Sequence, residues 1–318
     1  MSYDDFMRIA RPLMISMAIT SLTATAAFAV PPSSGTARQI ANAVAISPKI
    51  SKVTPKVLAA IPYSTYDWGK KLFPPRTNLG CATTTQCVFG SKQSKMTVVL
   101  FGDSHASMWV PALAPIARAN HFKLIVIWLA TCHVADVNVQ YEPFGFGTIP
   151  HYFDGCNTWL TKQIATIRSL HPKLVLLGER TTLVGHADKT PFTSAAWHDG
   201  LVRTITRLKT PTTRVAIFED LFWGNNLPGP CLSMNLKSVQ RCATSYTNPT
   251  VTGHQVAERK AARDTNTTFI PTHQWFCTTK TCSPVIGDYI PKRDQTHVSA
   301  SYAQYLTTVI ETALKPLL

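Results

Sequence analysis

The chain has 318 residues, enough for one large domain or two small ones, and 45% of them are hydrophobic, as in proteins that build a core. Its formal net charge is +14, from 31 Lys and Arg against 17 Asp and Glu, but the basic residues are scattered along the sequence. Because nucleic-acid binding usually needs a concentrated basic stripe or a known module, we expect no nucleic-acid partner. A dispersed positive charge fits a protein that works near anionic envelope polymers or membrane surfaces.

The N-terminus has the pattern of an export signal. Arg8 and Arg11 precede an apolar stretch, residues 12–28, which closes on the small-residue motif Ala27-Phe28-Ala29. A charged segment, an apolar segment and such a motif predict a signal peptide over residues 1–29, removed after Ala29. The alternative is an uncleaved membrane anchor, since the stretch is near the length that spans a bilayer. We therefore expect a secreted or periplasmic protein.

The eight cysteines agree with export. They occur as sequence neighbours, without a C-x-x-C pair and without histidines at zinc-ligand spacing. An even number of cysteines in an exported chain predicts disulfides rather than a metal site, and we expect neither a metal nor another cofactor. The predicted bridges are Cys81–Cys87, Cys132–Cys156, Cys231–Cys242 and Cys277–Cys282.

Residues 30–94 are rich in Pro, Ser, Thr and Lys, which predicts a linker or wrapping arm ending in the Cys81–Cys87 loop. From residue 95 onward, short apolar runs alternate with helical periodicity. The predicted strands are 96–101, 123–129, 174–177, 214–218 and 268–270, and the predicted helices are 106–119, 157–170, 194–208, 251–263 and 299–314. This alternation predicts an α/β fold for residues 95–318: a three-layer α/β/α sandwich with a mainly parallel sheet.

Two polar motifs stand at positions suited to chemistry. In "VVLFGDSHASMW", Ser104 follows the carboxyl end of the first strand, which is where open α/β sheets bind ligands. In "RDQTHVSASYAQYL", Asp294 stands three residues before His297, a spacing that lets the carboxylate reach Nδ1 of the imidazole. Gly, Asp and Ser also favour plain turns, but together the motifs predict a Ser104–His297–Asp294 triad, because a serine needs an oriented base to act as a nucleophile.

The same motifs resemble the SGNH hydrolase superfamily, a flavodoxin-like fold. "GDSH" in place of "GDSL", together with "ATCHV", "PGPC" and "FCTTKTCSPVIGDY", is similar to the SGNH domain of bacterial membrane acyltransferases that modify cell-surface glycans. The resemblance covers roughly residues 81–318. It implies that Ser104 is the nucleophile, His297 the base and Asp294 its orienting acid, with the Ser104 backbone N–H as one oxyanion donor.

The sequence departs from the superfamily in two blocks. No glycine occurs in residues 128–136, and Gly178-Glu179-Arg180-Thr181 stands where the superfamily has Gly-x-Asn-Asp. Gly178 and Arg180 are therefore candidates for the oxyanion or substrate site, with Arg180 stabilising developing charge in place of the Asn. The alternative is that Arg180 pairs with Glu179 or another surface acid. We expect Asp103 to hold the turn and His105 to be structural, as a cap.

These features predict an exported serine-dependent acyl-ester enzyme, either an O-acyl esterase or an O-acyltransferase. The expected substrate is an acylated cell-surface polysaccharide or a small acyl ester, and a separate membrane protein is a candidate acyl donor. The alternative is a catalytically silent glycan-binding or envelope-assembly module. The missing Gly and Asn blocks favour that alternative, whereas the retained Ser, Asp and His favour the enzyme.

Overall fold

The computed structural model describes most of the chain beyond the N-terminal segment, comprising residues 34–73, 80–81, 87–140, 154–181, 190, 192–221, 224–246 and 249–318. The predicted signal peptide, residues 1–29, lies outside the described residues. Among those that are described, no helix combines the length and the hydropathy needed to cross a membrane.

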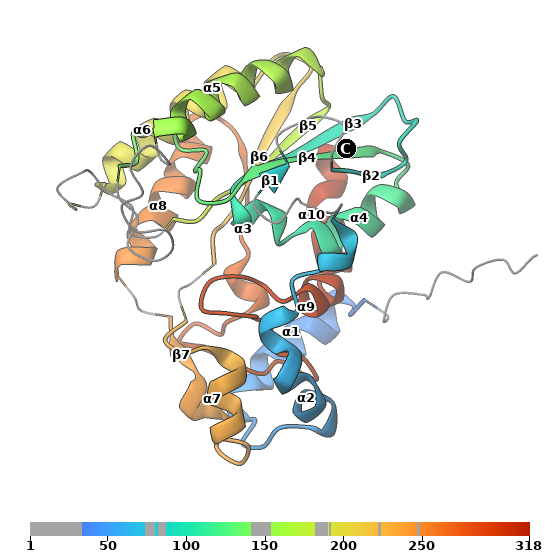
Figure 1. The fold of residues 1–318 in the computed structure, drawn as a ribbon, viewed down its shortest axis with the longest axis vertical. Coiled ribbons are helices and arrows are strands. Elements are labelled where there is room, and N and C mark those ends of the chain that lie inside the picture. The colour runs from blue at the N-terminus through green and yellow to red at the C-terminus, as the bar shows by residue number, and fades with distance from the viewer. Residues whose placement is uncertain are drawn as a thin grey trace, which may run out of the picture. The chain divides into compact units, whose positions relative to one another are not determined.

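A mainly parallel sheet forms the centre of the domain (Figure 1). Its described strands follow the order β1-β4-β3-β5-β6-β8, and β2 also pairs with β4. The strands from β4 to β8 run parallel, whereas β1 and β2 are antiparallel to β4. The bounds are β1 Gly80–Cys81, β2 Val88–Gly90, β3 Thr97–Gly102, β4 Lys123–Leu129, β5 Leu174–Gly178, β6 Arg214–Phe218 and β8 Thr268–Ile270.

Helices cover both faces of this sheet (Figure 1). In β3, Val98 and Leu100 pack with one helical layer, whereas Val99 and Phe101 pack with the other. A strand buried on both faces needs an unbroken apolar sequence, which explains the run before Ser104. The first layer contains α1 (Ala37–Ile46), α4 (Val110–Ala119), α9 (Ala300–Tyr305) and α10 (Thr307–Leu314), and the second contains α5 (Asp154–Ser169), α6 (Ser194–Leu208) and α8 (Pro249–Asp264). The predicted α/β/α sandwich is confirmed.

A smaller apolar cluster lies beside these layers. It joins α2 (Pro55–Ala60) to α7 (Pro228–Met234) and contains the Cys231–Cys242 bridge. Next to it in sequence, β7 (Thr244–Ser245) and β9 (Thr281–Cys282) form a two-stranded antiparallel sheet. The remaining helical turns are of the 3-10 type: Ser47–Lys49, Ile61–Tyr66, Lys70–Leu72, Val239–Cys242, His273–Trp275 and Lys315–Leu317.

Two predicted helices are each divided. The predicted helix 106–119 consists of α3 (Ser104–Ser107) and α4, and the predicted helix 299–314 consists of α9 and α10. Pro111 stands in the first turn of α4, and proline restricts the residue before it and removes one backbone donor. The chain therefore starts a new helix there instead of continuing α3.

The segment that we expected to be a linker or wrapping arm, residues 30–94, is more regular in its described part. It supplies α1 and α2, and its last residues form β1 and β2 at the edge of the sheet. Ile40 and Val44 of α1 are buried in the main core. Because only a few apolar residues of this segment pack against the core, its overall composition resembles that of a linker.

All four predicted disulfides are formed: Cys81–Cys87, Cys132–Cys156, Cys231–Cys242 and Cys277–Cys282. Each closes a loop of 24 residues or fewer, so each acts locally.

Candidate active site

Ser104 stands at a tight strand-to-helix turn. It is the first residue of α3, and only Asp103 separates it from the end of β3 at Gly102. Gly102 has φ +157°, and a Cβ atom there would lie 1.7 Å from the carbonyl oxygen of Gly178. A side chain at position 102 would therefore force β3 and β5 apart, so glycine is required for the turn that presents Ser104.

The Asp103 carboxylate holds this turn in place through two hydrogen bonds. It accepts hydrogen bonds from the backbone N–H of His105, at 2.7 Å, and of Arg180, at 2.9 Å. Asp103 is the N-cap of α3 and is fully buried, and burial raises the pKa of its carboxyl group. The prediction that Asp103 holds the turn is confirmed, and the helix cap is Asp103 rather than His105.

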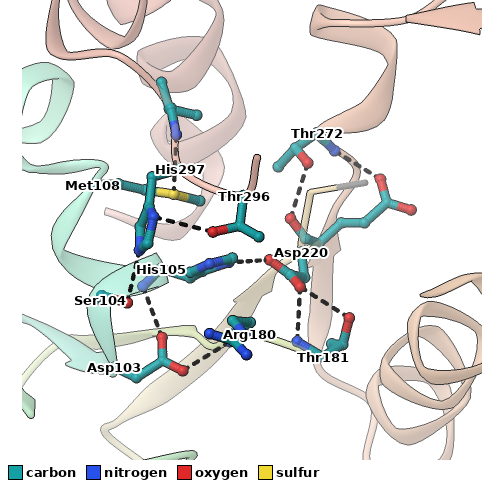
Figure 2. Close-up of polar contacts among 12 residues, drawn as sticks. Asp103, Ser104, His105, Met108, Arg180, Thr181, Asp220, Thr272, Thr296 and His297 are labelled. Carbon is teal, nitrogen blue, oxygen red and sulfur yellow. Dashed lines mark hydrogen bonds and ion pairs between the residues drawn. The ribbon is translucent and has the colours of Figure 1, made fainter. Parts of the chain in front are cut away.

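The loop before α9 brings Asp294 and His297 together. The Asp294 carboxylate accepts hydrogen bonds from the backbone N–H groups of Thr296 and His297, both at 2.8 Å. It also contacts Nδ1 of His297 at 2.9 and 3.0 Å. The backbone N–H of Val298 donates to Sδ of Met108, which ties this loop to the residues that follow Ser104 (Figure 2).

The structure places the three predicted triad residues in contact. Nε2 of His297 lies 2.9 Å from Oγ of Ser104 (Figure 2), while its Nδ1 faces Asp294. Burial lowers the pKa of His297 to about 4, against the opposing influence of the Asp294 carboxylate. Burial alone would raise the pKa of Asp294, but hydrogen bonds and charge from His297, with Arg293 nearby, lower it well below its usual range. At neutral pH this arrangement offers a neutral imidazole to the serine hydroxyl, which suits a nucleophile that attacks a carbonyl carbon.

Ser104 and His297 line a cavity of about 250 Å³. Arg180 and Arg293 line it as well, and Nε of Arg293 lies 3.3 Å from Oδ2 of Asp294. Two arginines therefore stand among the residues around the serine, where negative charge develops during acyl transfer.

The two oxyanion candidates have different positions. Arg180 lines the cavity, whereas Gly178 is not among the described residues that do so. A Cβ at Gly178 would lie 3.0 Å from the backbone of Ala106 in α3, which indicates a packing role for this glycine. The Glu179 carboxylate is buried and accepts hydrogen bonds from the backbone N–H groups of Val134 and Ala135.

His105 and Asp220 form a second histidine–carboxylate pair, which contacts the His297–Asp294 pair and which the sequence did not predict. Nδ1 of His105 is 2.5 Å from Oδ1 of Asp220, and both side chains are buried (Figure 2). The other carboxylate oxygen of Asp220 accepts from the backbone N–H and the hydroxyl of Thr181. The His105 ring meets the His297 ring edge to face, with centroids 4.7 Å apart. The His105 side chain thus contacts a buried carboxylate, and the cap of α3 is Asp103 rather than His105; a structural role for His105 stays a prediction.

Further titratable groups are buried beneath this pair. Burial lowers the pKa of His133 to about 3 and raises the pKa of Glu179 to about 8. Glu258, which accepts from the backbone N–H of Asp220, also has a strongly raised pKa because of burial. The sequence did carry a signal for this cluster, since Asp103, Glu179 and Asp220 each stand within two residues of the carboxyl end of a parallel strand.

No group of three or more His, Cys, Asp or Glu side chains in the described part of the chain is arranged to hold a metal ion.

Comparison with known proteins gives a consistent family and fold. Residues 74–312 match the sequence profile of a family described as an SGNH domain fused to AT3 domains. No curated protein matches the sequence. Among solved structures, the periplasmic domain of a lipopolysaccharide acetyltransferase from Salmonella ser. Paratyphi A is similar, with a TM-score of 0.57 and 16% identity over 82% of this chain and 98% of that one.

Two other solved structures are similar at lower scores. A GDSL-like lipase from Bacteroides thetaiotaomicron has a TM-score of 0.42 and 12% identity, over 70% of this chain and 90% of that one. A carbohydrate acetylesterase from Sinorhizobium meliloti has a TM-score of 0.41 and 13% identity, over 70% of this chain and all of that one.

Proposed function

Because the chain belongs to the family of SGNH domains described as fused to AT3 domains, we propose that it is an exported, serine-dependent acyl-ester enzyme of the cell envelope. The observation that carries this proposal is the 2.9 Å contact between Ser104 Oγ and His297 Nε2, made inside a cavity and backed by Asp294. An envelope glycan as substrate is supported by the similar fold of a periplasmic lipopolysaccharide acetyltransferase domain and by the dispersed positive charge of the chain.

The proposed reaction has two steps. Ser104 Oγ attacks the carbonyl carbon of an O-acyl ester while His297 Nε2 takes the hydroxyl proton, and Asp294 stabilises the imidazolium that forms. The ester C–O bond then breaks, and His297 returns the proton to the leaving alcohol. In the second step, water or a sugar hydroxyl gives its proton to His297 and attacks the acyl carbon. The bond between that carbon and Ser104 Oγ then breaks, and His297 returns the proton to Oγ, which regenerates the enzyme.

The oxyanion formed in each step needs donors close to Ser104. The Ser104 backbone N–H is one proposed donor, because the first N–H groups of a helix have no partner within it. Arg180 is the second proposed source of positive charge, since it lines the same cavity and its backbone is fixed by Asp103. It would take the place of the Asn side chain that the superfamily uses.

A separate membrane protein is the proposed acyl donor for the transfer reaction. The family description joins this domain to AT3 domains, so an acyl group delivered at the membrane would reach Ser104 from such a unit. Transfer to a sugar hydroxyl and hydrolysis by water then differ only in which nucleophile enters the second step.

The test is hydrolysis of p-nitrophenyl acetate by the purified exported chain, compared with the Ser104→Ala variant. We expect measurable turnover by the wild type and loss of that turnover in Ser104→Ala, with unchanged far-UV circular dichroism. Equal rates for the two proteins would contradict the proposal. Inactivity of the wild type, together with binding of an envelope glycan, would favour the silent glycan-binding module instead.

A further inference from the structure

The cavity beside Ser104 has an aromatic wall that comes from an unexpected part of the chain. Trp68 and Phe73, both partly exposed, line the cavity together with Ser104 and His297. Both residues precede residue 74, where the match to the family profile begins. The segment expected to be a linker therefore supplies part of the candidate active site.

Trp68 is held in place by the chain that follows His297. The carbonyl oxygen of Asp67 accepts from the backbone N–H of Ala300 at 2.8 Å. The Asp67 carboxylate accepts from the hydroxyl and the backbone N–H of Ser301, at 2.6 and 3.2 Å. These bonds fasten the residue before Trp68 to the first turn of α9, only a few residues after His297, so the position of Trp68 is coupled to that of the base.

The backbone beyond Trp68 lies close to the cavity as well. Gly69 has φ +69°, and a Cβ there would lie 3.3 Å from Pro111 Cγ and 3.5 Å from Ala300 Cβ; both of those residues line the cavity. Farther along the segment, Phe73 meets Trp128 edge to face, with centroids 6.2 Å apart. Since Trp128 also lines the cavity, the wall is anchored to the sheet as well as to α9.

The chemistry of the cavity suits a sugar ring rather than a long acyl chain. Its volume of about 250 Å³ is below the roughly 300–1,000 Å³ of sites for drug-sized ligands. Aromatic residues and two arginines line it, and a long aliphatic chain offers an arginine no hydrogen-bond acceptor. A pyranose has an apolar C–H face for an aromatic ring and hydroxyl oxygens for hydrogen-bond donors.

We propose that Trp68 and Phe73 form a pyranose subsite, in which Trp68 covers the apolar face of the sugar that carries or receives the acyl group at Ser104. This inference rests on the proposed acyl-ester function and names the substrate class that the site selects. Because every pyranose presents C–H groups on a ring face, the wall contributes affinity without fixing the identity of one sugar.

The experiment compares two kinds of ester on the same protein preparations. The sugar esters are the 2-, 3-, 4- and 6-O-acetyl derivatives of methyl α-D-glucopyranoside, and the reference ester is ethyl acetate, which has no ring. The readout is the ratio of kcat/KM for the best sugar ester to kcat/KM for ethyl acetate. Any unfolded fraction of a variant lowers both values equally, so it cancels in the ratio.

We expect the wild type to prefer a sugar ester and Trp68→Ala to lower the ratio by about tenfold, mainly through KM. That factor corresponds to about 50 Å² of apolar sugar surface left uncovered. Trp68→Phe should recover much of the ratio, and Phe73→Ala should lower it. The matched control is Tyr66→Ala, an aromatic residue of the same segment that is 75% exposed, and it should leave the ratio unchanged.

Other results would contradict either the pyranose subsite alone or the proposed function as well. A wild type that hydrolyses ethyl acetate without preferring any of the sugar esters, or a ratio unaffected by Trp68→Ala, would overturn the subsite alone. An equal fall in Tyr66→Ala would assign the effect to the segment as a whole and also overturn the subsite. If the wild type cleaves neither kind of ester and Ser104 does not react with a fluorophosphonate, the proposed function fails, and the subsite fails with it.

Discussion

Replacing His105 with Ala should destabilise the fold, because it leaves one oxygen of a buried carboxylate without its hydrogen-bond partner. The Asp220 side chain has no exposed surface and the His105 side chain is 2% exposed. Burial would raise the pKa of Asp220, but charge and hydrogen bonding from His105, together with Thr181, lower it, so the group is ionised at neutral pH. Leaving a buried polar group without its hydrogen-bond partner costs about 1–3 kcal/mol, and more when the group is charged.

Thr181 still donates to the other carboxylate oxygen, at 2.7 and 2.9 Å, which limits the loss. Because the Asp220 carboxylate is charged, we expect a loss at the upper end of the range for neutral groups. His105→Ala should lower the free energy of unfolding by about 3 kcal/mol, which corresponds to roughly 6–12 °C in Tm for a domain of this size. The assay is urea unfolding with the disulfides intact, followed by circular dichroism.

A double variant separates the effect of the buried Asp220 charge from that of simple packing. In His105→Ala/Asp220→Asn the remaining side chain is neutral, so the variant should be more stable than His105→Ala alone. A loss below 1 kcal/mol in His105→Ala, or no recovery in the double variant, would refute the reasoning that the buried charge dominates.

Two further predictions concern the triad. Asp294→Asn should keep the fold and lower kcat by as much as about 10⁴-fold, the loss seen for the equivalent change in a well-studied serine protease; a loss below tenfold would exclude Asp294 as the orienting group. Because burial lowers the pKa of His297, kcat/KM should stay constant as the pH falls from 7.5 to about 6 and decline only below that range, where the imidazole takes up a proton. An acid limb centred near pH 7 in a pH–rate profile would contradict the assigned environment of His297.

The central elements could be predicted from the sequence because their signals are local. The strands β4, β6 and β8 and the helix α6 have the predicted bounds, since each is an apolar run or a helical period bounded by polar residues. The candidate triad could be predicted for the same reason: Ser104 stands two residues after the end of a strand, and Asp294 is only three residues from His297.

The missed features depend on contacts between distant parts of the chain. The strands β1 and β2 have two and three residues, too few for a pattern, and they exist because β4 offers an edge to pair with. Asp220 meets His105 across 115 positions, and Trp68 reaches the cavity because Asp67 binds the start of α9. Such contacts form only when the sheet is packed, so a short stretch of sequence carries no sign of them.

The most direct test of the proposed nucleophile is the site of covalent reaction on the folded protein. Treatment with a fluorophosphonate probe, followed by proteolysis and mass spectrometry, should give one adduct on Ser104. The adduct should be absent in Ser104→Ala, and labelling should be much slower in His297→Ala. An adduct on a different residue, or undiminished labelling of Ser104→Ala, would contradict the claim that Ser104 is the nucleophile.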